Sequence, residues 1–304
     1  MNKPNLDLAK IRAFGNLEFL VKQMVEGFIT GLHKSPFHGF SVEFAEHQLY
    51  NTGQSTRNID WKVYAKTDRL YVKRYEEETN LRCHLLLDVS SSMYYPMDSH
   101  GKITFSAMAA GSIAYLLHKQ KDAVSLCTFS DKIHLQTPIK STPSHIHKIF
   151  IDLQQTLQTA PQQSKTAVSS VLHQIAEKIH RRSLVVIFSD MFDQMEDSEL
   201  LFSALQHLKH NKHEVLLFHV SDHQTERDFN FQNRPYEFID LESGEKIKLQ
   251  PDQMRKSYAT FTTAFYQNLK LKCGQYKIDF IEADISQGFD HILSAYLVKH
   301  AKMK

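Results

Sequence analysis

Apolar and polar positions alternate in blocks along most of this chain. From residue 81 onward, short apolar runs of strand length alternate with longer segments whose apolar positions recur at helical spacing. The pattern predicts strands at 81–88, 123–129, 132–136, 183–189, 213–220 and 276–282, and helices at 102–119, 143–156, 167–181, 196–210, 251–271 and 288–301. Because strands alternate with helices, the sequence predicts an α/β fold with a doubly wound, mainly parallel sheet.

The amino-terminal part of the chain departs from this alternation. Residues 7–32 carry an apolar face at helical spacing, which predicts a helix, whereas residues 39–80 are predicted to be strand-rich and irregular. We therefore expect an amino-terminal extension over 1–80 and one α/β domain over 81–304.

A second departure lies inside the α/β domain, at about residues 222–250. Two strand-like segments, 236–240 and 246–249, flank Ser243 and Gly244, and this arrangement predicts a hairpin. We expect this hairpin insertion to cover the periphery of the sheet, with a binding role as the alternative.

Composition indicates a large core and a reducing environment. Hydrophobic residues make up 42% of the 304 residues, and Cys83, Cys127 and Cys273 lie in or beside apolar stretches, which predicts buried free thiols. The amino terminus lacks the apolar core of a signal peptide, and no stretch approaches the roughly 20 apolar residues that cross a bilayer. These features predict a soluble cytoplasmic protein with no membrane span.

Charge gives little indication of a nucleic-acid partner. The net charge is only +2, and the basic cluster between Lys62 and Arg74 is followed at once by the acidic run 76–78. A nucleic-acid binder usually concentrates its positive charge on one face. Local compensation instead predicts a solvated face or an internal ion-pair network, so we expect no nucleic-acid binding.

The strand predicted at 81–88 ends in a cluster of polar side chains. Asp88, Ser90 and Ser92 follow its apolar run in the order Asp-x-Ser-x-Ser. Ligand sites in such sheets lie just beyond the carboxyl ends of the strands. One carboxylate and two hydroxyl groups are hard oxygen ligands, which suit magnesium or manganese better than zinc.

Two distant residues could complete a site with this cluster. Thr166 lies at the start of the helix predicted at 167–181, where it also suits the role of N-cap. Asp190 ends the apolar run of the strand predicted at 183–189. Two strands with acids at corresponding ends indicate a binding site more strongly than one such strand does.

This set of residues resembles the metal-ion-dependent adhesion site of von Willebrand factor A domains. Asp88, Ser90, Ser92, Thr166 and Asp190 match its ligands in order and approximate spacing. The resemblance implies a von Willebrand factor A-like fold and a divalent metal ion, Mg²⁺ first and Mn²⁺ or Ca²⁺ as alternatives. A vestigial site in such a fold is the other interpretation.

Residues 33–47, 57–62 and 67–73 closely resemble the signature block of a bacterial family, number fifty-eight among domains of unknown function. Its members join this block to a von Willebrand factor A-like domain and are commonly found beside MoxR-type AAA+ ATPases. The chain departs from the family pattern at one point, because Gln54 follows Gly53 where members usually have an acid.

The resemblance to von Willebrand factor A domains implies a non-catalytic protein-interaction module that binds an acidic side chain of a partner through its metal ion. The family resemblance implies a MoxR-type AAA+ ATPase, or its client, as that partner. A metal-dependent hydrolase is one alternative, although the chain lacks an Asp-x-Asp pair and a Gly-x-Ser-x-Gly elbow. A scaffold with a silent metal site is the other.

Overall fold

The computed structural model describes residues 8–33, 47–49, 61–67, 69–73, 81–159, 168–191, 198–241 and 244–301. The chain divides into two compact units, Met1–Phe28 with Leu81–Lys304 and Ile29–Asn80. The sequence predicted an extension over residues 1–80, whereas residues 1–28 belong to the α/β unit in the structure.

The larger unit is built on a six-stranded sheet of order β10-β7-β6-β3-β4-β5. Its strands are β3 (Arg82–Asp88), β4 (Ala123–Phe129), β5 (Ile133–Gln136), β6 (Leu184–Ser189), β7 (Glu214–Ser221) and β10 (Asp279–Asp284). Neighbouring strands are parallel except β4 and β5, which are antiparallel. The predicted α/β fold with a mainly parallel sheet is confirmed.

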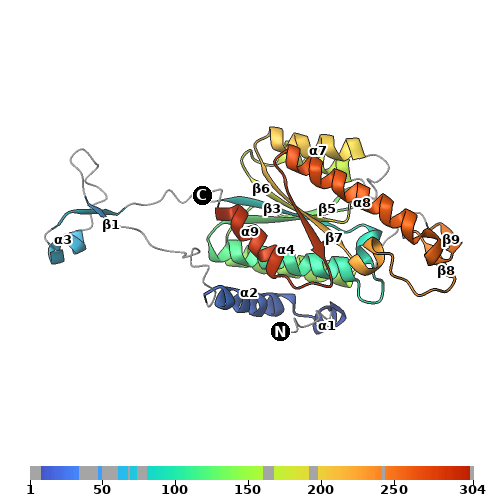
Figure 1. The fold of residues 1–304 in the computed structure, drawn as a ribbon. Coiled ribbons are helices and arrows are strands. Elements are labelled where there is room, and N and C mark those ends of the chain that lie inside the picture. The colour runs from blue at the N-terminus through green and yellow to red at the C-terminus, as the bar shows by residue number, and fades with distance from the viewer. Residues whose placement is uncertain are drawn as a thin grey trace. The chain divides into compact units, whose positions relative to one another are not determined.

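Helices cover both faces of this sheet (Figure 1). One face carries α4 (Gly101–Lys119), α5 (Pro143–Gln158) and α9 (Asp290–Ala301), and the other carries α6 (Val168–Lys178), α7 (Ser198–His210) and α8 (Pro251–Gln275). Apolar side chains of α6, α7 and α8 form one buried cluster with those of β6 and β7. The central strands are therefore enclosed on both sides, which explains their continuous apolar runs.

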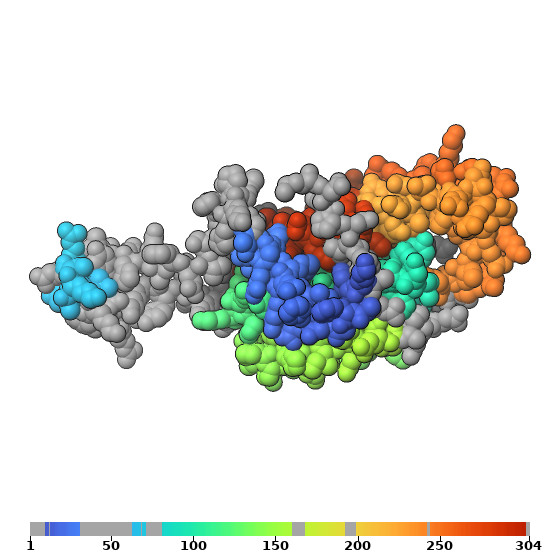
Figure 2. Space-filling view, turned by 90° about the horizontal axis from the view of Figure 1, so that it is seen from below, coloured from blue at the N-terminus to red at the C-terminus, as the bar shows by residue number. Residues whose placement is uncertain are grey.

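Two amino-terminal helices, α1 (Leu8–Phe14) and α2 (Leu17–His33), replace the single helix predicted at 7–32. The chain turns between them at Gly15, whose φ of 69° lies in the left-handed region. Figure 2 shows the blue surface of α1 and α2 beside the yellow-green surface of α5, and the Leu17 amide donates to Gln154 Oε1 at 3.1 Å. The start of α2 therefore forms an additional layer over α4 and α5.

The predicted hairpin is present as β8 (Tyr236–Ile239) paired antiparallel with β9 (Lys246–Leu249). Ser243 of the predicted turn lies outside the described residues. Between β7 and the hairpin lies a short helical segment, η4 (His223–Arg227). Arg255 of α8 donates to the carbonyl oxygens of Phe229 and Phe231 at 3.2 and 3.1 Å, so this connection is fastened to α8.

The smaller unit contains β1 (His47–Leu49) paired antiparallel with β2 (Tyr71–Lys73), and a helix, α3 (Trp61–Thr67). Helix α3 differs from the strand-rich structure predicted for 39–80. Within it, the hydroxyl group of Thr67 donates to the carbonyl oxygen of Val63 at 2.8 Å. Most of the signature block at 33–47 lies outside the described residues.

Candidate functional site

Strand β3 carries Asp88 to the carboxyl edge of the sheet. The side chains before it, Leu85 to Leu87, are buried because helices cover both faces of the strand. Asp88 itself has no exposed surface. Its Oδ1 accepts a hydrogen bond from the Ser90 amide at 2.9 Å, so the strand ends in a local turn that the aspartate side chain stabilises.

The two serines of the cluster continue this turn. Ser90 Oγ lies 3.1 Å from Ser92 Oγ, and both side chains are buried. The Met93 amide donates to the carbonyl oxygen of Ser90 at 3.1 Å, which begins the short helix η2 (Ser91–Tyr94). The turn therefore gathers the oxygen atoms of Asp88, Ser90 and Ser92 at one place.

Strand β6 brings Asp190 to the same edge. Leu87 of β3 is paired with Phe188 of β6, so the next residue, Ser189, lies level with Asp88. Ser189 Oγ donates to Asp88 Oδ2 at 2.6 Å, and Asp190 follows directly. The chain then bends at Met191, whose φ is 50°. Thr166, the fifth predicted ligand, lies outside the described residues, so its position stays a prediction.

Burial and Asp190 together make it costly to ionise Asp88. Burial raises the pKa of the Asp88 carboxyl group, and the negative charge of Asp190 raises it further, to about 7. Hydrogen bonds from Ser189 and Ser90 act in the opposite direction. Two acids close enough to affect one another form a place where an added positive charge is stabilising.

Lys102, which the sequence analysis did not single out, is part of the site. Its side chain lies in the first turn of α4 with 0% exposure, and its Nζ donates to Asp190 Oδ2 at 2.7 Å. A second, short hydrogen bond joins Lys102 to Glu226 of η4. The one sequence signal is that Lys102 begins a segment of almost entirely apolar or small residues.

The pKa of Lys102 reflects opposing effects. Burial lowers it, but the Asp190 and Glu226 carboxylates outweigh burial, so the pKa of Lys102 lies above its usual value. For Glu226, burial outweighs the opposing effect of Lys102, so the pKa of this carboxyl group lies above its usual value. The Glu226 side chain additionally accepts from the Asp222 amide at 2.8 Å. Lys102 therefore remains an ammonium group between two acids.

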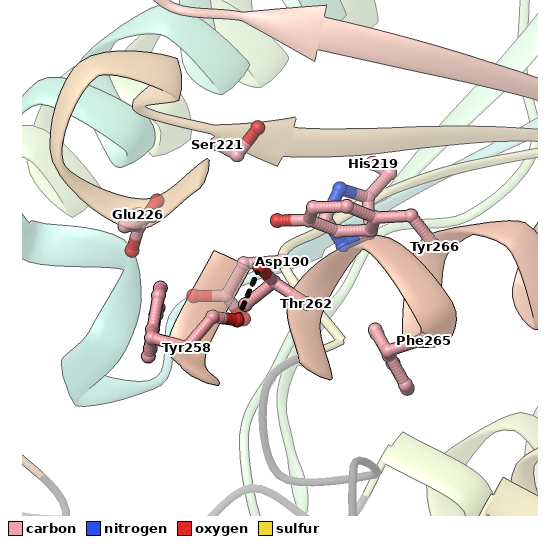
Figure 3. A pocket seen from close by; sticks show the side chains of 8 residues that line it. All are labelled: Asp190, His219, Ser221, Glu226, Tyr258, Thr262, Phe265 and Tyr266. Carbon is pink, nitrogen blue, oxygen red and sulfur yellow. Dashed lines mark hydrogen bonds between the residues drawn. The ribbon is translucent and has the colours of Figure 1, made fainter. Parts of the chain in front are cut away.

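A small pocket lies beside Asp190, on the side of β7 and α8 (Figure 3). It is lined by Asp190, His219, Ser221, Glu226, Tyr258, Thr262, Phe265 and Tyr266. The His219 and Tyr266 rings meet edge to face with centroids 4.8 Å apart. Because burial lowers the pKa of His219 to about 4, its imidazole is neutral and does not offset the carboxylates.

The groups at this edge suit a hard divalent cation. Asp88 and Asp190 are buried acids and Glu226 is partly buried, whereas Lys102 is the ammonium group that contacts Asp190 and Glu226. Serine hydroxyls and carboxylates are the oxygen ligands that Mg²⁺ accepts. Within the described ranges, no group of three or more His, Cys, Asp or Glu side chains is placed to hold a metal ion.

Several solved structures resemble this chain. The conserved hypothetical protein BatB from Bacteroides thetaiotaomicron is 14% identical, with a TM-score of 0.41, over 73% of this chain and 99% of that one. An aerotolerance-related membrane protein from Bacteroides fragilis NCTC 9343 is 14% identical, with a TM-score of 0.46, over 72% and 99%. An uncharacterized membrane spanning protein from Vibrio fischeri has a TM-score of 0.23 at 14% identity, over 72% and 97%.

The predicted cytoplasmic location is corrected by these neighbours, two of which are described as membrane proteins. Buried free thiols are typical of a folded domain in several settings and do not identify its compartment. In the part of the chain that the structure describes, no helix is both long and apolar enough to span a bilayer.

Two mycobacterial proteins are similar in sequence. Uncharacterized protein Rv1480 from Mycobacterium tuberculosis (strain ATCC 25618 / H37Rv) is 24% identical over 223 residues, which cover 73% of this chain and 68% of that protein. Uncharacterized protein Mb1516 from Mycobacterium bovis (strain ATCC BAA-935 / AF2122/97) gives the same figures. A family model described as "Protein of unknown function DUF58" matches residues 46–267, more than half of the chain. The chain therefore belongs to the DUF58 family.

Proposed function

We propose that this chain is a non-catalytic protein-interaction module that binds its partner through a divalent cation, Mg²⁺ in the first place. Asp88, Ser90, Ser92 and Asp190 would hold the ion, with Thr166 as a further ligand. An ion held largely by neutral hydroxyl groups stays electrophilic and accepts a carboxylate from a partner.

The observation that carries this proposal is the excess of buried acid at the carboxyl edge of β3 and β6. Asp88 has no exposed surface, lies under the influence of the Asp190 charge, and has no direct contact with Lys102 among the hydrogen bonds and ion pairs of the described residues. A buried carboxylate without a nearby positive charge is unfavourable. A divalent cation would supply the missing charge where the two serine hydroxyls also converge.

The partner we propose is a protein that offers an Asp or Glu side chain. The family resemblance favours a MoxR-type AAA+ ATPase or its client. The chain has no Gly-x-x-x-x-Gly-Lys-Ser/Thr phosphate loop, so the proposal assigns any ATP hydrolysis to the partner.

Metal binding is tested by titrating Mg²⁺ into the protein in a calorimeter. We expect saturable binding by the wild type and a loss of roughly 100-fold or more in affinity for Asp88→Asn and Ser92→Ala, because each removes a ligand. Asp88→Asn preserves the side-chain shape and hence the turn. Asp131→Ala is the matched control, since this exposed acid follows the neighbouring strand β4. Equal affinity of all four proteins would contradict the metal site.

Partner binding is tested by capture from native lysate with wild type and Asp88→Asn, each with Mg²⁺ and with chelator. Capture by the wild type with Mg²⁺ alone supports the module. The ion pair between Lys102 and Asp190 favours a second candidate, a scaffold with a silent metal site, which predicts equal capture under all four conditions. Turnover of phosphate or acyl esters that Asp88→Asn abolishes would instead indicate the hydrolase.

A further inference from the structure

Lys102 is a buried lysine that lies between acidic side chains of the candidate site. It has 0% exposure and contacts two acids from different elements, Asp190 after β6 and Glu226 in η4. Its ring contact is with Tyr95, whose centroid lies 5.9 Å from the ammonium nitrogen. A buried ammonium group depends on its acidic partners, because protein rather than water surrounds it.

Asp190 is therefore shared between Lys102 and the proposed metal ion. It is the carboxylate that Lys102 contacts at 2.7 Å, and it is also one of the proposed metal ligands. Two cations that contact the same carboxylate lie close together and repel each other. This repulsion is strong where water is excluded. Any stabilisation that Asp190 gives to Lys102 is consequently reduced when a second cation binds beside it.

Resting on the proposed metal site, we infer that Lys102 competes with the divalent cation for Asp190 and thereby lowers the affinity of the site. In the ion-free protein, Lys102 offsets the charge of Asp190 next to Asp88. Glu226 makes the exchange possible, because it remains a carboxylate partner for Lys102 when Asp190 binds the ion. Lys102 is thus a positioning residue that determines how tightly the site binds metal.

The test is Mg²⁺ titration calorimetry on the full chain with four proteins: wild type, Lys102→Met, Glu226→Gln and the double variant. Lys102→Met removes the competitor, so affinity should rise by about tenfold, within the range of a close charge pair. Glu226→Gln leaves Lys102 with Asp190 as its one acidic partner of the two, so affinity should fall. Lys119→Met, at an exposed position on the same helix, is the control and should leave affinity unchanged.

The double variant distinguishes competition between Lys102 and Mg²⁺ for Asp190 from a general effect of the site's net charge on Mg²⁺ affinity. It removes one positive and one negative charge, so a field effect alone predicts the wild-type affinity, whereas competition predicts an affinity about tenfold tighter. It also avoids the unpaired buried charge that could unfold Lys102→Met. A double variant with wild-type affinity would overturn the inference and leave the metal site standing. Absence of Mg²⁺ binding by every variant would overturn both.

Discussion

Two buried histidines show how strongly the interior acts on single side chains. Burial lowers the pKa of His84 on β3 and of His219 on β7 to about 4, from an ordinary value of 6.5. The neutral His84 ring is held by Ser125, with 2.6 Å between Nδ1 and Oγ. Below pH 6.5 these histidines bind protons in the unfolded chain but stay neutral in the folded protein. Each histidine therefore lowers the free energy of unfolding as the pH falls toward 4.

His84→Gln should therefore reduce the sensitivity of the fold to mild acid. From the two pKa values, His84 contributes a loss of about 2 kcal/mol in the free energy of unfolding between pH 7 and pH 5. Urea unfolding of wild type and variant at both pH values measures this difference. His210→Gln, at an exposed position, is the control and should keep the wild-type dependence. If the free energy of unfolding of His84→Gln depended on pH as it does in the wild type, the effect described for His84 would be contradicted.

Gly101 begins α4 next to Lys102 and has no room for a side chain. A Cβ atom there would lie 2.7 Å from Pro96 Cδ and 2.9 Å from Ile285 Cδ1. Gly101→Ala should consequently lower the free energy of unfolding by roughly 1–3 kcal/mol. Gly274→Ala is the matched control, because that helical glycine has open space around it and alanine should be neutral or slightly stabilising. Thermal or urea unfolding of the wild type and both variants measures these changes in the free energy of unfolding.

At the scale of elements, the start of α2 is part of the α/β unit. Val21 and Val25 have 0% exposure, and a Cβ atom on Gly111 of α4 would lie 3.3 Å from Val21 Cγ2 and 3.1 Å from Phe150 Cε1 of α5. The three helices therefore approach one another closely. Periodicity predicted the helix but not this contact, because an apolar face does not specify which surface covers it.

Val21→Ala and Val25→Ala should each lower the free energy of unfolding of the α/β unit by about 2 kcal/mol, since each leaves a cavity among packed helices. Urea unfolding followed by circular dichroism measures the change. Gln23→Ala, at an exposed position of the same helix, should stay within about 0.5 kcal/mol of wild type. If all three variants matched wild type, α2 would not be packed as described.

Across the whole molecule, the sheet order decides which chain segments meet at the candidate site. Because β3 is paired with β6 on one side and β4 on the other, the ends of β3 and β6 are neighbours although they lie about a hundred residues apart. Parallel strands bring their carboxyl ends to one edge, so the sequence predicts that Asp88 and Asp190 lie at the same edge, but only the pairing of β3 with β6 makes them neighbours.

The sequence by itself determined the alternation of strands and helices, the end of β3 and the turn through Asp88, Ser90 and Ser92. These features depend on apolar periodicity and on hydrogen bonds between residues two positions apart, which are local. Only the tertiary structure decided that Lys102 lies between Asp190 and Glu226, 88 and 124 residues away in sequence. No spacing in the chain encodes that ion pair, because it arises from three elements packing around one buried charge.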